Sequence, residues 1–253
     1  MCLILVAWRS HPQYPLVVAA NRDEFFARRT ASADFWPDQP HILAGRDLEG
    51  GGTWMGVTRS GRFAALTNFR DPAAQRPDAP SRGALVADFL AGNADIDAYL
   101  DQIEPRAASY NGFNLLLGER DRLVWFSNVA GGRTELASGV FGVSNHLLDS
   151  PWPKVGAGKT ALAAAMGALP DSTPLFELLR DDSVHPDAAL PRTGVSLEWE
   201  RLLSSAFVRA PGYGTRSSTV LTMGEGGANF DEQTWLEGGE PGGRTHFQFP
   251  LRG

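Results

Sequence analysis

The order in which strand and helix patterns follow one another is the feature that most constrains the fold of this chain. Paired strand patterns come first, a block of helical patterns follows, and the same order then repeats before the chain closes with strands. A regular alternation of single strands and helices would instead indicate a doubly wound parallel sheet. The observed order predicts an α+β fold in which antiparallel sheets pack with helices on their outer faces.

The strand patterns are short, rich in branched and aromatic residues, and often separated by turn-forming residues. Residues 27–52 look irregular, because Pro37, Pro40 and several glycines interrupt them. We predict strands at residues 2–8, 16–20, 53–58, 62–67, 113–118, 122–127, 140–144, 215–222 and 245–249.

The helical patterns carry apolar residues four positions apart. After residues 81–83, for example, Leu85 pairs with Phe89 and Val86 with Leu90. Further helices are predicted at residues 95–103, 152–169, 175–180 and 197–207. Because no internal repeat or linker interrupts the chain, we expect one domain over residues 1–253.

Charge and hydropathy limit the class of partner. The net charge is −6, and lysines and arginines form no run, so nucleic acid is not expected as a partner. The apolar opening ends at Arg9, lacks a basic segment before it, and is far shorter than the ~20 residues that span a bilayer. The sequence therefore predicts a cytoplasmic protein without a membrane span, and it leaves the oligomeric state open.

The chain has one cysteine, and it directly follows the initiator methionine. A single thiol excludes an internal disulfide and any site with several thiolate ligands. Removal of Met1 would leave Cys2 with both a thiol and an α-amino group, whose ordinary pKa values of ~8.5 and ~8 suit proton exchange. We therefore predict that Cys2 is a nucleophile that supplies its own general base. The alternative is a small buried residue on an edge strand.

Four polar residues, Asn21, Arg22, Asp23 and Glu24, follow the second predicted strand. If the first hairpin folds back on itself, they lie beside Cys2. Arg22 would then favour the thiolate, and Asp23 or Glu24 would hold and orient the ammonium form of the amine. A solvated charged turn is the alternative.

Two asparagines end strand patterns. Asn68 follows residues 63–67, and Asn145 follows residues 141–144. A side-chain amide at such a position can donate to a developing oxyanion, or it can simply bond its own turn. The five histidines show no paired ligand spacing, so no catalytic zinc site is expected.

Several short motifs occur in a characteristic order, and as a set they resemble the NRDE family, also called the transport and Golgi organization protein 2 family. The motifs are Met1-Cys2, Asn21-Arg22-Asp23-Glu24, Gly51-Gly52-Thr53-Trp54, Thr67-Asn68, Ser81-Arg82-Gly83, Tyr110-Asn111-Gly112-Phe113-Asn114 and Ser144-Asn145. The resemblance implies an N-terminal-nucleophile hydrolase-like fold, a four-layer αββα sandwich with two antiparallel sheets. More distantly, the chain is similar to choloylglycine hydrolases and penicillin V acylases, which also begin at a cysteine after the initiator methionine.

Similarity to those hydrolases also implies roles for particular residues. Cys2 matches their nucleophile, and Asn68 and Asn145 match the asparagines of their oxyanion site. Arg22 and Asp23 match an Arg and an Asp that follow the second strand, although with a different spacing.

The candidate substrate-binding residues are Asn21, Glu24, Trp54 and Arg216, of which Arg216 loosely matches a late basic residue of that site.

The sequence leaves three functions open. The first is a cysteine hydrolase of a non-peptide amide bond in a small-molecule amide or acyl substrate, with no cofactor. The second is a non-catalytic haem-trafficking protein that binds non-covalent haem through Cys2 or a histidine, since family members have been linked to haem trafficking and to lipid or acyl-CoA metabolism. The third is a protein that binds an acyl or amide ligand without turnover.

Overall fold

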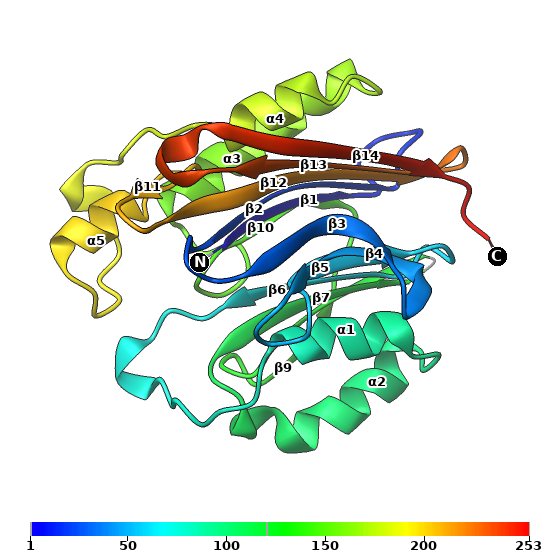
Figure 1. Cartoon of the computed structure of the whole chain (residues 1–253), viewed down its shortest axis with the longest axis horizontal. Coiled ribbons are helices and arrows are strands. Elements are labelled where there is room, and N and C mark those ends of the chain that lie inside the picture. Colours follow the sequence, from blue (N-terminus) through cyan, green and yellow to red (C-terminus); the bar gives the residue numbers. More distant parts are fainter. Residues whose placement is uncertain (1, 120, 253) are drawn as a thin grey trace.

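Two antiparallel sheets form the centre of the molecule, and helices cover the outer face of each (Figure 1). The structure is a computed structural model that describes residues 2–119 and 121–252. Both sheets have seven strands within the described residues. The predicted α+β class with two antiparallel sheets is therefore confirmed.

The first sheet has the strand order β10-β1-β2-β12-β13-β14, with β11 paired to β12. Every pairing in it is antiparallel. Its strands are β1 Cys2–Trp8, β2 Leu16–Phe25, β10 Gly139–Val143, β11 Arg209–Ala210, β12 Tyr213–Gly224, β13 Gly227–Trp235 and β14 Pro241–Phe249.

The second sheet follows the chain from one edge to the other, in the order β3-β4-β5-β6-β7-β8-β9. Consecutive strands pair because short turns join most of them, which favours antiparallel neighbours. Its strands are β3 Thr30–Trp36, β4 Gln39–Asp47, β5 Met55–Thr58, β6 Phe63–Asn68, β7 Phe113–Glu119, β8 Arg122–Ser127 and β9 Gly132–Glu135.

The helices form the two outer layers. On the second sheet lie α1 Gly83–Ala91 and α2 Ile96–Ile103, and on the first lie α3 Pro153–Ala165 and α4 Thr173–Leu179, while α5 Leu197–Leu202 lies near the end of that layer (Figure 1). Short 3-10 helices cover Pro72–Ala74, Glu104–Ser109, Met166–Ala168, Asp187–Ala189 and Glu237–Gly239. Among the described residues, no helix is long and apolar enough to cross a membrane.

Strand β1, which lies between β10 and β2, is apolar along its whole length because both of its faces are buried. Side chains alternate between the faces of a strand. Ile4 and Val6 therefore pack between the two sheets, while Leu3 and Leu5 pack beneath the helices of the outer layer. By the same alternation, Cys2 belongs to the face that looks toward the second sheet.

The expectation that residues 27–52 are irregular was wrong, because most of this segment forms β3 and β4. Pro40 obscured the pattern, since proline cannot donate to a strand ladder. The register of β3 and β4 shifts between Phe35 and Trp36, and Pro40 lies next to Gln39, the partner of Trp36. An irregularity of this kind accommodates a proline inside a strand pair.

Other elements differ in extent. The second strand continues to Phe25, so the tetrad of residues 21–24 lies within β2 and not in the turn after it. The helix expected at residues 197–207 ends at Leu202. Strand β13 was missed because it is polar, yet its Glu232 is buried and accepts the backbone N–H of Ala33 at 2.7 Å.

Candidate active site

Cys2 begins β1 and lies opposite Arg22 of β2 in the antiparallel register. Its residue is 8% exposed, and it lines a cavity of about 640 Å³. Loops and strand ends from both sheets enclose this cavity, and among the other lining residues are Trp54, Asn68 and Arg82. The structure thus brings Cys2 and Arg22 together with residues far away in the sequence.

Burial raises the pKa of the Cys2 thiol, and the charge of Asp23 raises it further. Arg22 and a hydrogen bond from the backbone N–H of Asp23 act in the opposite direction. Because burial is the largest effect, the thiol is protonated at neutral pH. Nucleophilic attack by Cys2 therefore requires a base that removes this proton.

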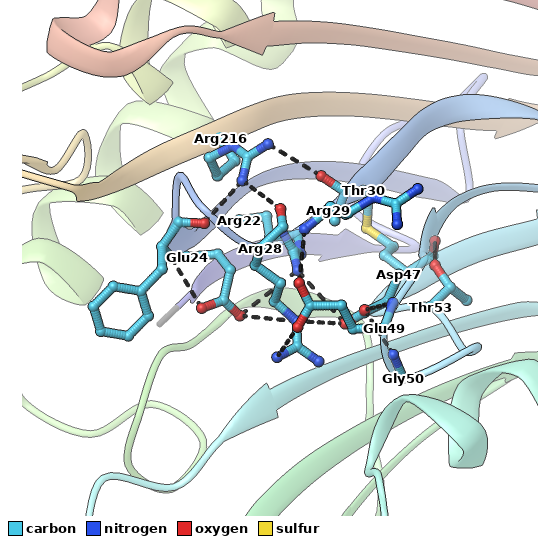
Figure 2. A network of polar contacts seen from close by, with 12 residues as sticks. Arg22, Glu24, Arg28, Arg29, Thr30, Asp47, Glu49, Gly50, Thr53 and Arg216 are labelled. Carbon is cyan, nitrogen blue, oxygen red and sulfur yellow. Dashed lines mark hydrogen bonds and ion pairs between the residues drawn. The ribbon is translucent and has the colours of Figure 1, made fainter.

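Arg22 is held by carboxylates within the cavity. Its guanidinium lies 3.6 Å from Glu24 and 3.9 Å from Asp47, and Arg28 lies 2.8 Å from the same Asp47. Figure 2 shows these side chains as one connected network that links β2 and the turn after it to the end of β4. Glu24 therefore orients Arg22, and both line the cavity as the sequence predicted for a site.

Alternation along β2 separates the tetrad into two pairs. Asn21 is fully buried on the face toward the helices, where its amide donates to Leu179 O at 2.7 Å and Ala206 O at 2.8 Å. Ser218 donates to its side-chain oxygen at 2.6 Å. Asn21 is not among the described residues that line the cavity, and its contacts tie β2 to the layer above. Its predicted role in substrate binding stays a prediction.

Asp23 is buried on β2 as Asn21 is, but unlike Asn21 it lines the cavity. Thr215 donates its hydroxyl to Asp23 Oδ1 at 2.7 Å. Burial raises the pKa of the Asp23 carboxyl, while the positive charges of Lys154 and Arg70 oppose this shift. The charge of Asp23 thus acts on the Cys2 thiol, and the buried cations Lys154 and Arg70 act on Asp23.

The two predicted asparagines come from different sheets and meet at one corner of the cavity. Asn145 is buried, and its side-chain amide donates to the backbone oxygen of Asn68 at 2.9 Å. The neighbouring Ser144 donates to the backbone oxygen of Cys2 at 2.8 Å. This segment therefore fastens the end of β6 to the start of β1, and of the two predicted asparagines it is Asn68 that lines the cavity.

Arg216 also lines the cavity, but its donors face the chain itself. Its guanidinium donates to the backbone oxygens of Phe25 at 2.9 Å and Arg28 at 3.0 Å, and to Thr30 Oγ1 at 3.2 Å (Figure 2). These bonds hold the turn between β2 and β3. Trp54 lines the cavity as well, and its backbone oxygen accepts the N–H of Leu66 at 2.7 Å.

Arg82 is a site residue to which sequence reasoning gave no role, although its Ser-Arg-Gly motif was recognised. It precedes α1, donates to Gly112 O at 3.0 Å and lines the cavity. Burial lowers the pKa of its guanidinium, and the charge of the Cys2 thiolate opposes that shift, so the two groups interact across the cavity. Two glycines allow this placement, since a Cβ on Gly52 would lie 2.4 Å from the backbone of Gly83.

A second set of residues carried no signal in the sequence. Arg70, Lys154 and Glu200 are buried and come together near Asp23 only in the folded chain. Within the described part of the chain, no group of three or more His, Cys, Asp or Glu residues is placed to hold a metal ion.

Two antiparallel sheets between helical layers, with a cysteine at the start of β1, define a class of protein: the fold of the N-terminal-nucleophile hydrolases. A solved structure of the Caenorhabditis elegans N-acylethanolamine-hydrolyzing acid amidase ortholog aligns with a TM-score of 0.50. The alignment covers 87% of this chain and 92% of that chain, at 12% sequence identity. The implied fold is therefore confirmed.

The family can be stated more narrowly. The family model described as "Transport and Golgi organisation 2" matches residues 1–237. The Bos taurus Transport and Golgi organization protein 2 homolog is 37% identical over 95% of each chain. The Drosophila melanogaster Transport and Golgi organization protein 2 is 33% identical over 98% of each. This chain belongs to the transport and Golgi organisation 2 family, as the motifs predicted.

Proposed function

We propose that this protein is a cysteine N-terminal-nucleophile hydrolase that cleaves a non-peptide amide bond in a small-molecule substrate. The carrying observation is that Cys2, at the start of β1, opens into a cavity lined also by Arg22, Asn68 and Arg82. A thiol nucleophile must stay reduced, which supports action in the cytoplasm. The proposal requires removal of Met1, a residue outside the described range.

In the first half of the reaction, the Cys2 thiol attacks the carbonyl carbon of the amide and forms a C–S bond. The α-amine of the processed Cys2 takes the thiol proton and passes it to the leaving nitrogen. The C–N bond breaks, the amine product leaves, and a thioester remains on Cys2. The raised pKa of the buried thiol supports this route, since a thiol that is protonated at neutral pH needs an adjacent base.

In the second half, water attacks the thioester carbonyl while the same amine accepts a proton from the water. The C–S bond breaks, the carboxylic acid product leaves, and the proton returns to the sulfur. Within each half, Asp23 orients the transient ammonium form from its buried position on β2.

The tetrahedral intermediates carry a negative oxygen that needs hydrogen-bond donors. Asn68 is the proposed donor, because its residue lines the cavity at the end of β6. Asn145 supports the position of Asn68 through the 2.9 Å bond from its side-chain amide to the Asn68 backbone oxygen. Arg82, which also lines the cavity, adds a positive charge.

The first test is the intact mass of the purified protein. A mass short by one methionine leaves Cys2 at the N-terminus and meets the requirement of the mechanism. Complete retention of Met1 overturns the proposal, because the amine then belongs to a different residue from the thiol.

Turnover is tested next with a panel of fluorogenic N-acyl amides, since the structurally similar worm protein is titled an N-acylethanolamine-hydrolyzing amidase. Mass spectrometry of the quenched reaction is expected to show an acyl group on Cys2, and Cys2→Ala is expected to abolish turnover. Equal turnover by wild type and Cys2→Ala would refute the assignment of the nucleophile.

Haem binding remains the alternative, and the same Cys2→Ala variant distinguishes it. Addition of haem to the wild type is expected to leave the Soret band of free haem unchanged. A new Soret band that shifts in Cys2→Ala would favour a haem carrier over the hydrolase.

A further inference from the structure

Lys154 is a buried cation that the mechanism above does not use. It is the second residue of α3, is 3% exposed, and its Nζ makes no hydrogen bond within the described part of the chain. Helix α3 packs directly on β1 and β10, so Lys154 sits beneath the strand that begins with Cys2. A buried ammonium group without a hydrogen bond is costly, and such groups concentrate at functional sites.

The charged groups around Lys154 come from four other elements or loops. They are Asp23 of β2, Cys2 of β1, Arg70 just after β6, and Glu200 of α5. Tyr213 of β12 is coupled to the same set through Asp23, Cys2 and Arg70. The folded chain thus brings these charged groups close enough for their charges to act on one another and on Cys2.

Both carboxylate oxygens of Glu200 in this cluster already accept hydrogen bonds from other residues. One of its oxygens accepts from Arg70 at 2.8 Å, and the other accepts the backbone N–H and the hydroxyl of Thr193, both at 2.7 Å. Arg70 also contacts Trp152, whose ring centroid lies 4.9 Å from the guanidinium carbon. Asp23 is therefore the carboxylate that the Lys154 charge chiefly offsets, and Asp23 heads the attractive charges acting on Lys154.

Asp23 has opposing effects on the reaction. Its carboxylate is needed to orient an ammonium group, yet its negative charge raises the pKa of the Cys2 thiol. A positive charge behind Asp23 resolves this conflict, because it stabilises both the Asp23 carboxylate and the Cys2 thiolate.

We propose that Lys154 is a positioning residue that acts on Cys2 through Asp23, by offsetting the Asp23 charge so that the thiol reacts at neutral pH. Arg70 and the Thr215 hydroxyl still favour the Asp23 carboxylate when Lys154 is removed, and its negative charge then acts on the thiolate without the Lys154 charge to offset it. The inference deepens the proposed function, and its test needs no substrate.

The test is the rate of Cys2 alkylation by iodoacetamide as a function of pH. Cys2 is the one thiol of the chain, so intact mass reports its modification without ambiguity. Lys154→Met is expected to raise the apparent pKa of alkylation by about half a unit or more, which slows alkylation about threefold at neutral pH. Should this variant not fold, Lys154→Gln also removes the charge and is measured in its place.

Lys154→Arg provides the opposite change. Burial lowers the pKa of Lys154 to about 8, so its charge is lost within the range of the assay, whereas arginine stays charged throughout. The apparent pKa of alkylation is therefore expected to rise in the order Lys154→Arg, wild type, Lys154→Met. A purely structural role would not produce this order.

Lys159→Met is the matched control, because Lys159 lies on the same helix but forms a partly exposed ion pair with Asp149 at 2.8 Å. It is expected to leave the alkylation profile unchanged. An unchanged profile in Lys154→Met, or an equal shift in Lys159→Met, overturns the proposal. Loss of the proposed hydrolase function would leave this outcome unaffected, since alkylation requires the thiol alone.

Discussion

Gly52→Ala tests whether the close approach of two loops positions Arg82 over the thiol. A Cβ at Gly52 would lie 2.4 Å from both the carbonyl carbon and the oxygen of Gly83, and 2.8 Å from Ala84 N. These are backbone atoms at the start of α1, so no flexible side chain can move aside. The loops must separate, which also strains the 3.2 Å bond from Thr53 N to Gly83 O.

The magnitude follows from the size of that overlap. An ordinary carbon contact is about 3.5–4.0 Å, so the backbone must shift by about 1 Å. Overpacking of this kind costs about 1–3 kcal/mol. For a chain of this size, each kcal/mol lowers Tm by about 2–4 °C, so the expected decrease is about 2–12 °C.

Two measurements check the prediction: Tm by circular dichroism, and the rate of Cys2 alkylation at neutral pH. Alkylation is expected to slow, because displaced Arg82 no longer favours the thiolate. Gly156→Ala is the control, since Gly156 lies within α3 and a Cβ there has no neighbour within 4 Å. Alanine is favoured over glycine in a helix by about 1 kcal/mol, so this control is expected to raise Tm. The reasoning fails if Gly52→Ala melts at or above the wild-type temperature.

Three further predictions concern other parts of the site. Arg70→Met leaves Glu200 buried without its cation and is expected to cost about 3–5 kcal/mol of unfolding free energy, measured by urea denaturation; an equal midpoint would contradict this. Asn68→Ala removes the proposed oxyanion donor and is expected to lower kcat about 100-fold with an unchanged Tm, so unaltered kcat would exclude that role. Burial raises the pKa of the Glu232 carboxyl above its ordinary 4.5, so the folded state binds the carboxyl proton more tightly than the unfolded state does. The wild type therefore loses stability as pH rises from about 4.5 through the higher pKa of the folded state. Glu232→Gln should therefore gain stability relative to wild type as pH rises from about 4.5 to neutral, and a difference independent of pH would refute the assignment.

Most of the fold prediction came from local patterns of apolar residues in the sequence. The branched run of β1 and the four-residue spacing at Leu85 and Phe89 identified a strand and a helix correctly, because burial of a face imposes a period on the sequence. The prediction was wrong for β3 and β4, where Pro40 lies within a strand at a register irregularity. Turn residues inside a strand pair are indistinguishable from a loop until the partner strand is known.

For the site, too, part of the prediction came from the sequence and part required the structure. The position of Cys2 and the tetrad that contains Arg22 were visible in the sequence, since a lone thiol after Met1 and a charged strand are unusual on their own. The four residues of the tetrad alternate between the two faces of β2, as neighbours on a strand do, but only the folded sheet shows what each of them contacts. The substrate role predicted for Asn21 stays a prediction, and the structure adds that its side-chain amide donates to Leu179 O and Ala206 O.

What the sequence by itself determined is the fold class, the family and the position of the single thiol, because these are recorded in patterns of neighbouring residues and in motif order. Only the tertiary structure decided that Arg82 faces Cys2 and that Lys154 lies behind Asp23. The charge on a lysine is the same everywhere in a sequence. Its effect depends on burial and on the groups that surround it, and those are set when strands and helices distant in the chain pack together.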